Sequence, residues 1–402
     1  MKKCYLFFLL IFLSSFVFAD NLINTSDGRF LFITSVGKYD LTFPAWKDFD
    51  AKGDADGALI LFDKNKIVKK VSIGGVSDDN FYDVCRCEYD GCFYAIGSAY
   101  CDSIGTGDFR ELKKKGKRDC IIAKFDKNLK LLKTVNFGFG PDAYNFVNDI
   151  LIGKKGEIYV CGRVYSESGK QDAFAVNFNT DLKALNYVKC KGDYLNGSAQ
   201  FDSMIFNDKG NIIFCGSESK ADDFSPANSF VTEFDKNLKK MVKWENMVYK
   251  DKSLILSSIE RDGANYVMSG YVIEDEEYTV ACLCKKNTDT GKYTVQTFVP
   301  DLDYNGRLPL CSNFIKTEKK DRIVIFGYGN VYMGNGDYED TYYRDFALVY
   351  SDRENIKNYK SVFLPKNSAV SMYSGNNTEK YIVFSVVLDR ETGEYRLVRT
   401  EF

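Results

Sequence analysis

The feature that most constrains the fold of this 402-residue chain is an internal repeat. One repeated element is a short apolar run that ends in Phe-Asp or a related pair, and seven copies of it follow one another. The three clearest copies run GALILFD from Gly57, DCIIAKFD from Asp119 and NSFVTEFD from Asn228, each followed by Lys-Asn. Such self-similarity predicts an architecture built from one supersecondary unit repeated along the chain.

A second element alternates with the first and reads GCFYAIG, GEIYVCG or GNIIFCG in its clearest copies. Successive closing glycines from Gly97 to Gly327 lie 65, 54, 54 and 57 residues apart. Short aromatic and β-branched runs at a period of this length are typical of a β-propeller. The glycine that ends each copy indicates a β-bulge or a close approach of two backbones.

Each repeat can be written as four strands, A to D. In one repeat these are Phe81–Asp90, Gly91–Gly97, Asp119–Asp126 and Leu129–Phe137. The fold class we expect is all-β: a single β-propeller of seven blades, each with four antiparallel strands, with six or eight blades left open. The segment Leu22–Thr25 is expected either to complete the last blade or to form strand A of the first.

The first 19 residues have the pattern of a secretory signal peptide. Lys2 and Lys3 precede an apolar run, and Ala19 supplies the small residue before the expected cleavage site. An uncleaved anchor is the rival interpretation, although the run is short for a membrane span. We therefore expect residues 1–19 to be removed and residues 20–402 to form the propeller domain, secreted, periplasmic or held at the cell surface, with no transmembrane span after cleavage.

Composition excludes several kinds of chemistry. The chain has no histidine, which removes Ser-His-Asp catalysis, Cys-His catalysis and every imidazole metal site. A formal net charge of −2 gives no reason to expect a nucleic-acid partner. The 12 cysteines recur at equivalent strand positions, as Cys161 and Cys215 do, so most are interpreted as small buried residues, and one or two disulfides remain open.

The repeat resembles a bacterial β-propeller repeat family whose units run DAFVAKFD, a turn containing Gly-Gly, and then DGNIYVAG. Here the matching segments are Asp172–Phe178, Gly74–Asp79 and Gly210–Gly216. The resemblance covers most of the chain after the signal segment and fades after Glu245. It implies an exported or surface scaffold, and it carries no catalytic residue that can be transferred to this sequence.

Strand order predicts two unlike faces. The short A–B and C–D turns lie at one end of every blade, which we call the turn face. The long B–C and D–A links lie at the other end, the loop face, and long loops on a rigid frame are where binding residues usually occur. Aromatic residues in these links are candidates for ligand contact: Phe43, Trp46, Phe109, Tyr194, Phe224, Tyr304, Tyr338, Tyr342 and Tyr343.

Three loop motifs could carry chemistry. Asp301, Asp303 and Asn305 alternate before Gly306, as oxygen ligands do in the first half of a calcium loop, although Ser312 stands where an EF-hand has glutamate. The segment from Gly53 to Gly57, with Asp54 and Asp56, is a weaker version. The other two motifs are the acidic group Asp337, Glu339 and Asp340, beside Tyr304 and Tyr338, and the basic run from Lys113 to Arg118.

The acidic group suits either ligand contact or paired-carboxylate chemistry on a glycan. The basic run suits an anionic polymer, but a solvated loop is the favoured interpretation because the rest of the chain is acidic. We expect an exported, monomeric, non-catalytic propeller that binds a protein or glycan through its loop face, with no cofactor other than calcium as a candidate. The alternative is a carboxylate-based glycan hydrolase or lyase, with calcium as its candidate cofactor.

Overall fold

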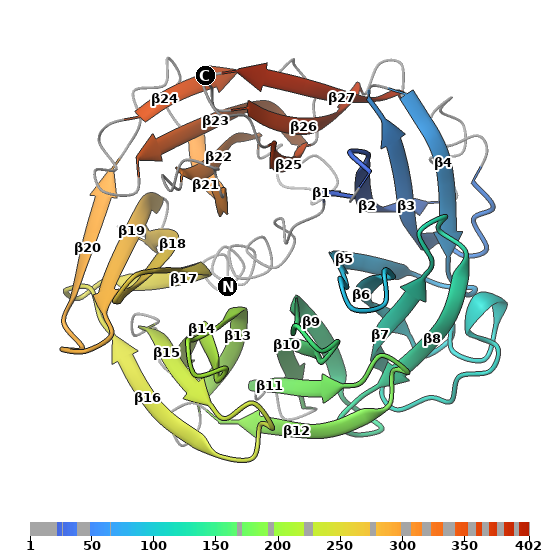
Figure 1. Cartoon of the computed structure of the whole chain (residues 1–402), viewed down its shortest axis with the longest axis horizontal. Helices are drawn as coiled ribbons and strands as arrows, with labels where there is room; N and C mark the ends of the chain where they lie inside the picture. Colours follow the sequence, from blue (N-terminus) through green and yellow to red (C-terminus); the bar gives the residue numbers. More distant parts are fainter. Residues whose placement is uncertain are drawn as a thin grey trace.

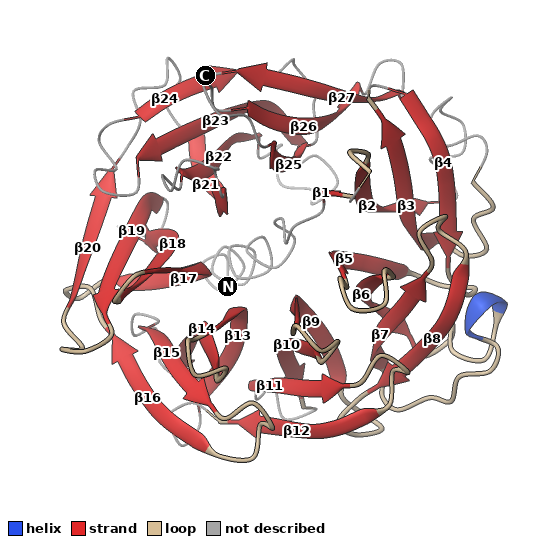
Figure 2. Cartoon of the chain, in the orientation of Figure 1, coloured by secondary structure: helices blue, strands red, loops and turns tan. Residues whose placement is uncertain are grey.

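The computed structural model describes residues 22–401 apart from 26, 38–48, 65, 167–170, 192–196, 221–227, 274–278, 299–306, 316–322, 333–341, 353–358, 364–369, 376–381 and 390–393. Beyond residue 306 it describes the backbone of the strands. The described residues form an all-β protein in which one short helical turn, η2 (Gly107–Phe109), is the exception (Figure 2). The signal segment lies outside the described residues.

The strands group in the order that the repeat predicts. Those of the first four repeats are β1 (Leu22–Asn24), β2 (Phe30–Gly37), β3 (Ala55–Asp63), β4 (Lys66–Ile73); β5 (Asp79–Arg86), β6 (Phe93–Tyr100), β7 (Arg118–Phe125), β8 (Leu131–Phe137); β9 (Tyr144–Ile152), β10 (Ile158–Tyr165), β11 (Gln171–Phe178), β12 (Ala184–Cys190); β13 (Gly197–Phe206), β14 (Ile212–Lys220), β15 (Asn228–Phe234), β16 (Met241–Met247). Those of the rest are β17 (Ser253–Asp262), β18 (Asn265–Ile273), β19 (Thr279–Asn287), β20 (Tyr293–Phe298); β21 (Arg307–Ile315), β22 (Ile323–Tyr332), β23 (Tyr342–Asp352), β24 (Tyr359–Phe363); β25 (Val370–Gly375), β26 (Ile382–Asp389), β27 (Glu394–Glu401).

Consecutive strands pair antiparallel within each group, so the four-strand interpretation of the repeat is confirmed for β1 to β24. The groups β5–β8 and β9–β12 join into one sheet through a single parallel pair, Arg118 with Tyr144. Figure 1 shows the groups standing around a common centre, with the first strand of each group nearest the centre and the last at the periphery. Because Leu22–Asn24 pairs with β2, this segment is strand A of the first group.

The core is divided into layers between neighbouring groups. One buried cluster joins β2 and β3 to β5, β6 and β7, and the next joins the second group to the third. Of the ten cysteines whose side chains the structure describes, none is in a disulfide and seven are buried. Cys161 and Cys215 point at backbone carbonyls of the next group, Phe201 and Leu256. The interpretation of these cysteines as small packing residues is confirmed.

The glycine that ends strand B marks both a bulge and a close approach. Opposite Gly97, Gly162, Gly216 and Gly270, the register of strand A shifts by one residue. A Cβ on Gly216 would lie 2.0 Å from the Gln200 carbonyl oxygen, which is far inside contact distance. Any side chain here would therefore force the two strands apart, which explains why the repeat keeps glycine.

The C–D turns are held by the first residue of the Asp-Lys-Asn motif. The Asp126 carboxylate accepts hydrogen bonds from the Asn128 and Lys130 amides at 2.8 and 2.9 Å. Leu129 ends the turn in the left-handed region, with φ of 57°, although its side chain is buried. That conformation costs a leucine about 1–2 kcal/mol, and burial of the side chain contributes about 1.5–3 kcal/mol, so burial outweighs strain.

The turn gives a first testable prediction. We expect Asp126→Ala to lower the free energy of unfolding by about 1 kcal/mol, because two backbone amides lose their acceptor. Asp126→Asn keeps an acceptor oxygen, and Asn179 already fills the equivalent place in the next group, where it accepts from the Asp181 and Lys183 amides. Urea unfolding should therefore show little change for Asp126→Asn, and an equal loss in both variants would contradict this account.

The turn face is occupied by contacts between neighbouring groups. The strand B tyrosine Tyr159 donates a hydrogen bond at 2.9 Å to the Lys236 carbonyl in the C–D turn of the next group. Tyr94 donates to Asp90 in its own A–B turn at 2.6 Å, and its hydroxyl lies 3.2 Å from the Thr180 carbonyl of the next group. Lys124 also donates to the Thr180 carbonyl at 2.9 Å. These bonds explain the recurring tyrosine of strand B as a latch between repeats.

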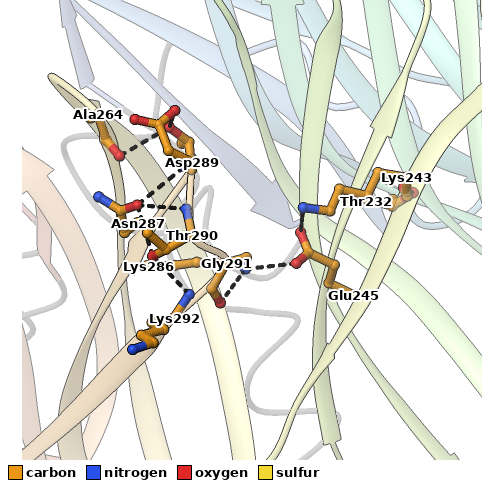
Figure 3. A network of polar contacts seen from close by, with 11 residues as sticks. Thr232, Lys243, Glu245, Ala264, Lys286, Asn287, Asp289, Thr290, Gly291 and Lys292 are labelled. Carbon is orange, nitrogen blue, oxygen red and sulfur yellow. Dashed lines mark hydrogen bonds and ion pairs between the residues drawn. The ribbon is translucent and has the colours of Figure 1, made fainter.

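An ion pair between the buried Lys286 and the half-buried Glu245 joins β16 to the next group at the same end (Figure 3). The Lys286 ammonium contacts Glu245 at 3.0 Å and donates to the Gly291 carbonyl at 2.9 Å. Burial raises the pKa of Glu245, but Lys243 and Lys286 outweigh it and hold that pKa below its ordinary value. In the fourth group Ile213 stands where Tyr94 and Tyr159 stand in the two groups before it, and this ion pair joins that group to the next.

No helix in the part of the chain that the structure describes is long and apolar enough to cross a membrane.

Candidate functional site

The predicted ligand and metal residues cannot be placed. Asp301, Asp303 and Asn305, and the group of Tyr304, Asp337, Tyr338, Glu339 and Asp340, all lie outside the described residues. Within the described residues, no group of three or more cysteine or acidic side chains is arranged to hold a metal ion. The site that the structure does show comes from other residues.

Two predicted loop features have other roles. Phe109, a candidate for ligand contact, is buried in the core because η2 turns it back against β3, β5 and β7. Asp56, from the weaker version of the calcium motif, accepts the Lys52 and Gly53 amides at 2.8 and 3.2 Å. Its carboxylate therefore closes its own loop, and burial raises its pKa.

The same loop closure recurs one repeat later. Asp119 accepts the Lys115 amide at 3.0 Å and the Asn136 side-chain amide at 2.6 Å. Both loops read Lys-Gly-x-x-Asp, which is a local signal the sequence carries. A Cβ on Gly74 would lie 2.3 Å from the Asp56 carboxylate, so the Gly-Gly turn leaves room for this buried acid.

Carboxylates on the inner strands also have structural partners. Asp83 accepts the Ile150 amide of the next group at 3.2 Å, and Asp149 accepts the Met204 amide of the group after that at 2.7 Å. Burial raises the pKa of Asp149, against the hydrogen bonds from Met204 and Ser203. These acids fasten one inner strand to the next, and their positions are equivalent in the repeat.

The bulges opposite the strand B glycines supply a different set of side chains. The inserted residues in β5, β9 and β13 are Tyr82, Asn148 and Asp202. Asp202 accepts a hydrogen bond from Gln200 at 2.7 Å and is near the positive charge of Arg163. Burial raises the pKa of Asp202 to about 7, although Arg163 opposes the shift.

Two buried arginines lie beside these bulges, at the loop-face ends of their strands. Arg118 is 7% exposed and donates to Ser98 at 2.8 Å and to Tyr82 at 2.6 Å. Arg163 is 2% exposed, and its Nη1 donates to Gln200 at 3.2 Å and to Asn148 at 3.4 Å. All four acceptors are neutral.

The two guanidiniums lie against the same aromatic ring. The Phe146 ring centroid is 4.6 Å from the Arg118 guanidinium carbon and 5.1 Å from that of Arg163. Tyr100 lies 4.8 Å from Arg118, and Tyr165 lies 5.9 Å from Arg163. We call these five residues the loop-face arginine cluster. Within the described part of the chain, neither arginine forms an ion pair.

Two effects offset the cost of burying these charges. The cation–π contacts with the aromatic rings contribute about 0.5–2 kcal/mol, and the Asp202 carboxylate lies near Arg163 and interacts with its charge. The half-buried rings of Tyr100, Phe146 and Tyr165 leave apolar surface beside the charge. Sequence reasoning missed Arg118 because it ends a basic run that was interpreted as a solvated loop, whereas pairing with Tyr100 turns it inward.

Comparison with known proteins does not assign a family. No family model matches the chain, and no curated protein matches its sequence. Similar solved structures include a protein of unknown function from Dyadobacter fermentans, with 10% identity, a TM-score of 0.49 and coverage of 79% of this chain and 92% of that one. A mutant of Synechocystis apocarotenoid oxygenase has 12% identity, a TM-score of 0.46 and coverage of 86% and 71%. A neuraminidase-like protein of A/little yellow-shouldered bat has 8% identity, a TM-score of 0.44 and coverage of 79% and 91%.

Proposed function

We propose that this chain is an exported, monomeric, non-catalytic seven-bladed β-propeller that binds a protein or glycan through its loop face. The seven repeats support the blade count, and β1 lying beside β25 supports closure of the ring. The signal pattern of residues 1–19 supports export to the cell surface, periplasm or medium.

One observation carries the choice of the loop face. On the turn face, tyrosine and lysine side chains bond to turn carbonyl groups of the next group, as Tyr159 does with Lys236. On the loop face, the hydrogen-bond partners of the two buried arginines are neutral among the described residues, and the Asp202 carboxylate lies near Arg163. The loop face therefore offers charged and aromatic side chains, whereas polar groups of the turn face already bond to the next group.

A binding screen with face-specific variants tests this function. The chain from residue 20 would be screened against glycans and surface proteins, with and without chelator. Tyr144 is 39% exposed at the loop-face end of β9, and Tyr89 is 65% exposed in an A–B turn. We expect Tyr144→Ala to weaken binding severalfold and Tyr89→Ala to leave it unchanged. The reverse pattern would refute loop-face binding. If the chelator changes neither the binding nor the melting temperature, calcium is excluded as a cofactor.

A carboxylate-based glycan hydrolase or lyase is the second candidate, and one observation favours it. The raised pKa of Asp202, about 7, is the range in which a carboxyl group serves as general acid or base at neutral pH. Asp149 of the preceding group is a second nearby acid, since both acids raise the pKa of Cys161. Turnover of a glycan that is abolished by Asp202→Asn would support the enzyme, and the absence of turnover across a panel of glycans would exclude it.

A further inference from the structure

Two cysteines face each other across the A–B turn of the second group. The Cys87 amide donates to the Cys92 carbonyl at 2.9 Å, which continues the pairing of β5 and β6 one step beyond Arg86 and Phe93. Of the cysteines whose side chains the structure describes, these two alone are directly opposed across paired chain segments. The pair is therefore a candidate for a chemical role besides packing.

The placement of the pair suits a disulfide. Directly opposed residues of an antiparallel pair have Cα atoms about 4.5–5.5 Å apart, and a disulfide spans about 4.4–6.8 Å between Cα atoms. The side chains of opposed residues lie on the same side of a sheet, and both cysteines pack in the cluster between the second and third groups. Burial, the Asp90 charge and the charge of Cys87 all raise the pKa of the Cys92 thiol, so the two thiols lie close enough to interact.

One acidic residue contacts both cysteines. The Asp90 carboxylate accepts the Cys92 amide at 3.0 Å and hydrogen-bonds to the Cys87 thiol. The Cys92 thiol donates to the Asp90 carbonyl at 3.7 Å. Tyr94 and Lys124 hold the same carboxylate in place, at 2.6 and 2.9 Å. Asp90 therefore gathers the two cysteine side chains at one point of the turn.

The turn is open to an oxidant at Cys92. Cys92 is half-buried and the neighbouring Tyr89 is 65% exposed, whereas Cys87 is fully buried. A small disulfide in solution can therefore react with Cys92 first. Cys87 then needs to reach only the Cys92 sulfur, which lies within the same turn.

We propose that Cys87 and Cys92 are a reversible dithiol that closes the A–B turn as a disulfide, with a small-molecule disulfide such as oxidised glutathione as the oxidant. The Cys92 thiolate attacks one sulfur of oxidised glutathione, which forms a mixed disulfide and releases one glutathione thiolate. The Cys87 thiolate then attacks the Cys92 sulfur and expels the second glutathione. The two cysteines lose two electrons and two protons, and oxidised glutathione takes them up as two thiols.

This inference goes beyond the proposed binding function, because the turn lies on the face opposite to the loop face. The proposed export would place the pair where disulfides form and persist. Its success or failure leaves the face-specific comparison of Tyr144 and Tyr89 to decide the binding function.

Oxidation of the folded chain followed by peptide mapping tests the disulfide. Oxidised glutathione is added at about pH 9, because burial raises the pKa of both thiols and the exchange needs the thiolate. Cleavage after Arg86 and after Glu88 places Cys85, Cys87 and Cys92 on three different peptides. We expect the Cys87 peptide to be joined to the Cys92 peptide and to be released by dithiothreitol.

Three results of the mapping would overturn the proposal. They are free thiols at both positions after oxidation of the folded chain, glutathione retained on Cys92 with Cys87 still free, and a bond from Cys92 to any cysteine other than Cys87.

Variants separate the disulfide from a packing role. We expect the oxidised wild type to melt a few degrees above the reduced wild type, because the bond restricts the unfolded chain. Cys92→Ser should lose this difference. Cys85→Ser is the matched control and should keep it, since Cys85 is also half-buried and packs in the same cluster. A difference that persists in Cys92→Ser, or that disappears in Cys85→Ser, would assign the bond to other cysteines and overturn the proposal.

Discussion

The protein is expected to be most stable near pH 4 and to lose stability as the pH rises toward 7, above which the loss levels off. Burial raises the pKa of both Asp79 and Asp202 to about 7, whereas an aspartate in the unfolded chain titrates near 3.9. The folded state therefore binds more protons than the unfolded state between about pH 4 and pH 7. Stability is greatest below this window and falls as the pH rises through it.

The loss is expected to be large. One pKa unit corresponds to about 1.4 kcal/mol, so the two acids together account for roughly 2–5 kcal/mol between pH 5 and pH 8. Burial raises the pKa of Asp56 and Asp119 in the same direction. Below pH 4 the trend reverses, because the Asp126 carboxylate has a lowered pKa owing to its bond with the Lys130 amide. The chain has no histidine, so no imidazole obscures the window.

Thermal melts from pH 4 to pH 8 measure this loss of stability, and Asp202→Asn is the matched variant. Asparagine copies the size of the protonated acid and already occupies the equivalent bulge as Asn148. Arg163 and Asp149 are the charged groups near Asp202, and both remain in the variant. We expect a fall in Tm on the order of 5 °C from pH 5 to pH 8 in the wild type, and a clearly smaller fall in the variant. A Tm that rises toward pH 8 would contradict the raised pKa values of Asp79 and Asp202.

Gly216→Ala is expected to be among the most damaging single substitutions in the chain. The new Cβ would lie 2.0 Å from the Gln200 carbonyl oxygen and 2.7 Å from the Phe230 ring. Neither neighbour can move without opening the pair of strands at the bulge, so we expect a loss of several kcal/mol or no soluble protein.

Gly210→Ala is the control within the same group of strands. Gly210 has φ of 76°, and a Cβ there would meet nothing within 4 Å. Its substitution tests backbone strain alone, which costs about 1–2 kcal/mol. Urea unfolding should give Gly216→Ala a much lower free energy of unfolding than Gly210→Ala. Equal losses would mean that the strand B glycine is retained for its conformational freedom and not for the close approach.

Local rules predicted much of the fold. The spacing of the glycines predicted the length of the repeat and the bulge at Gly162. The Asp-Lys-Asn motif predicted the C–D turn that Asp126 stabilises. The left-handed conformation of Leu129 was not predictable, because burial against the neighbouring group outweighs the local preference. Phe109 and Arg118 were misjudged for a related reason: each belongs to a polar loop in sequence, and contacts with distant strands bury it.

The candidate site was less predictable than the fold. The residues at the bulges belong to no sequence motif. Tyr82, Asn148 and Asp202 are related only because each is the inserted residue at the same position of its group. The strand B glycines could have identified these residues. Once the register of strands A and B is known, the residue inserted opposite each glycine can be read from the sequence.

Hydrogen exchange of the chain with and without a ligand identified in the binding screen tests the central claim most directly. The account predicts slower exchange at the loop-face ends of β9 and β10, around residues 144–147 and 163–165, and no change in the A–B turns at residues 88–91 and 153–156. Protection confined to the turn face, or no protection at the ends of β9 and β10, would contradict the claim that the loop face is the binding surface.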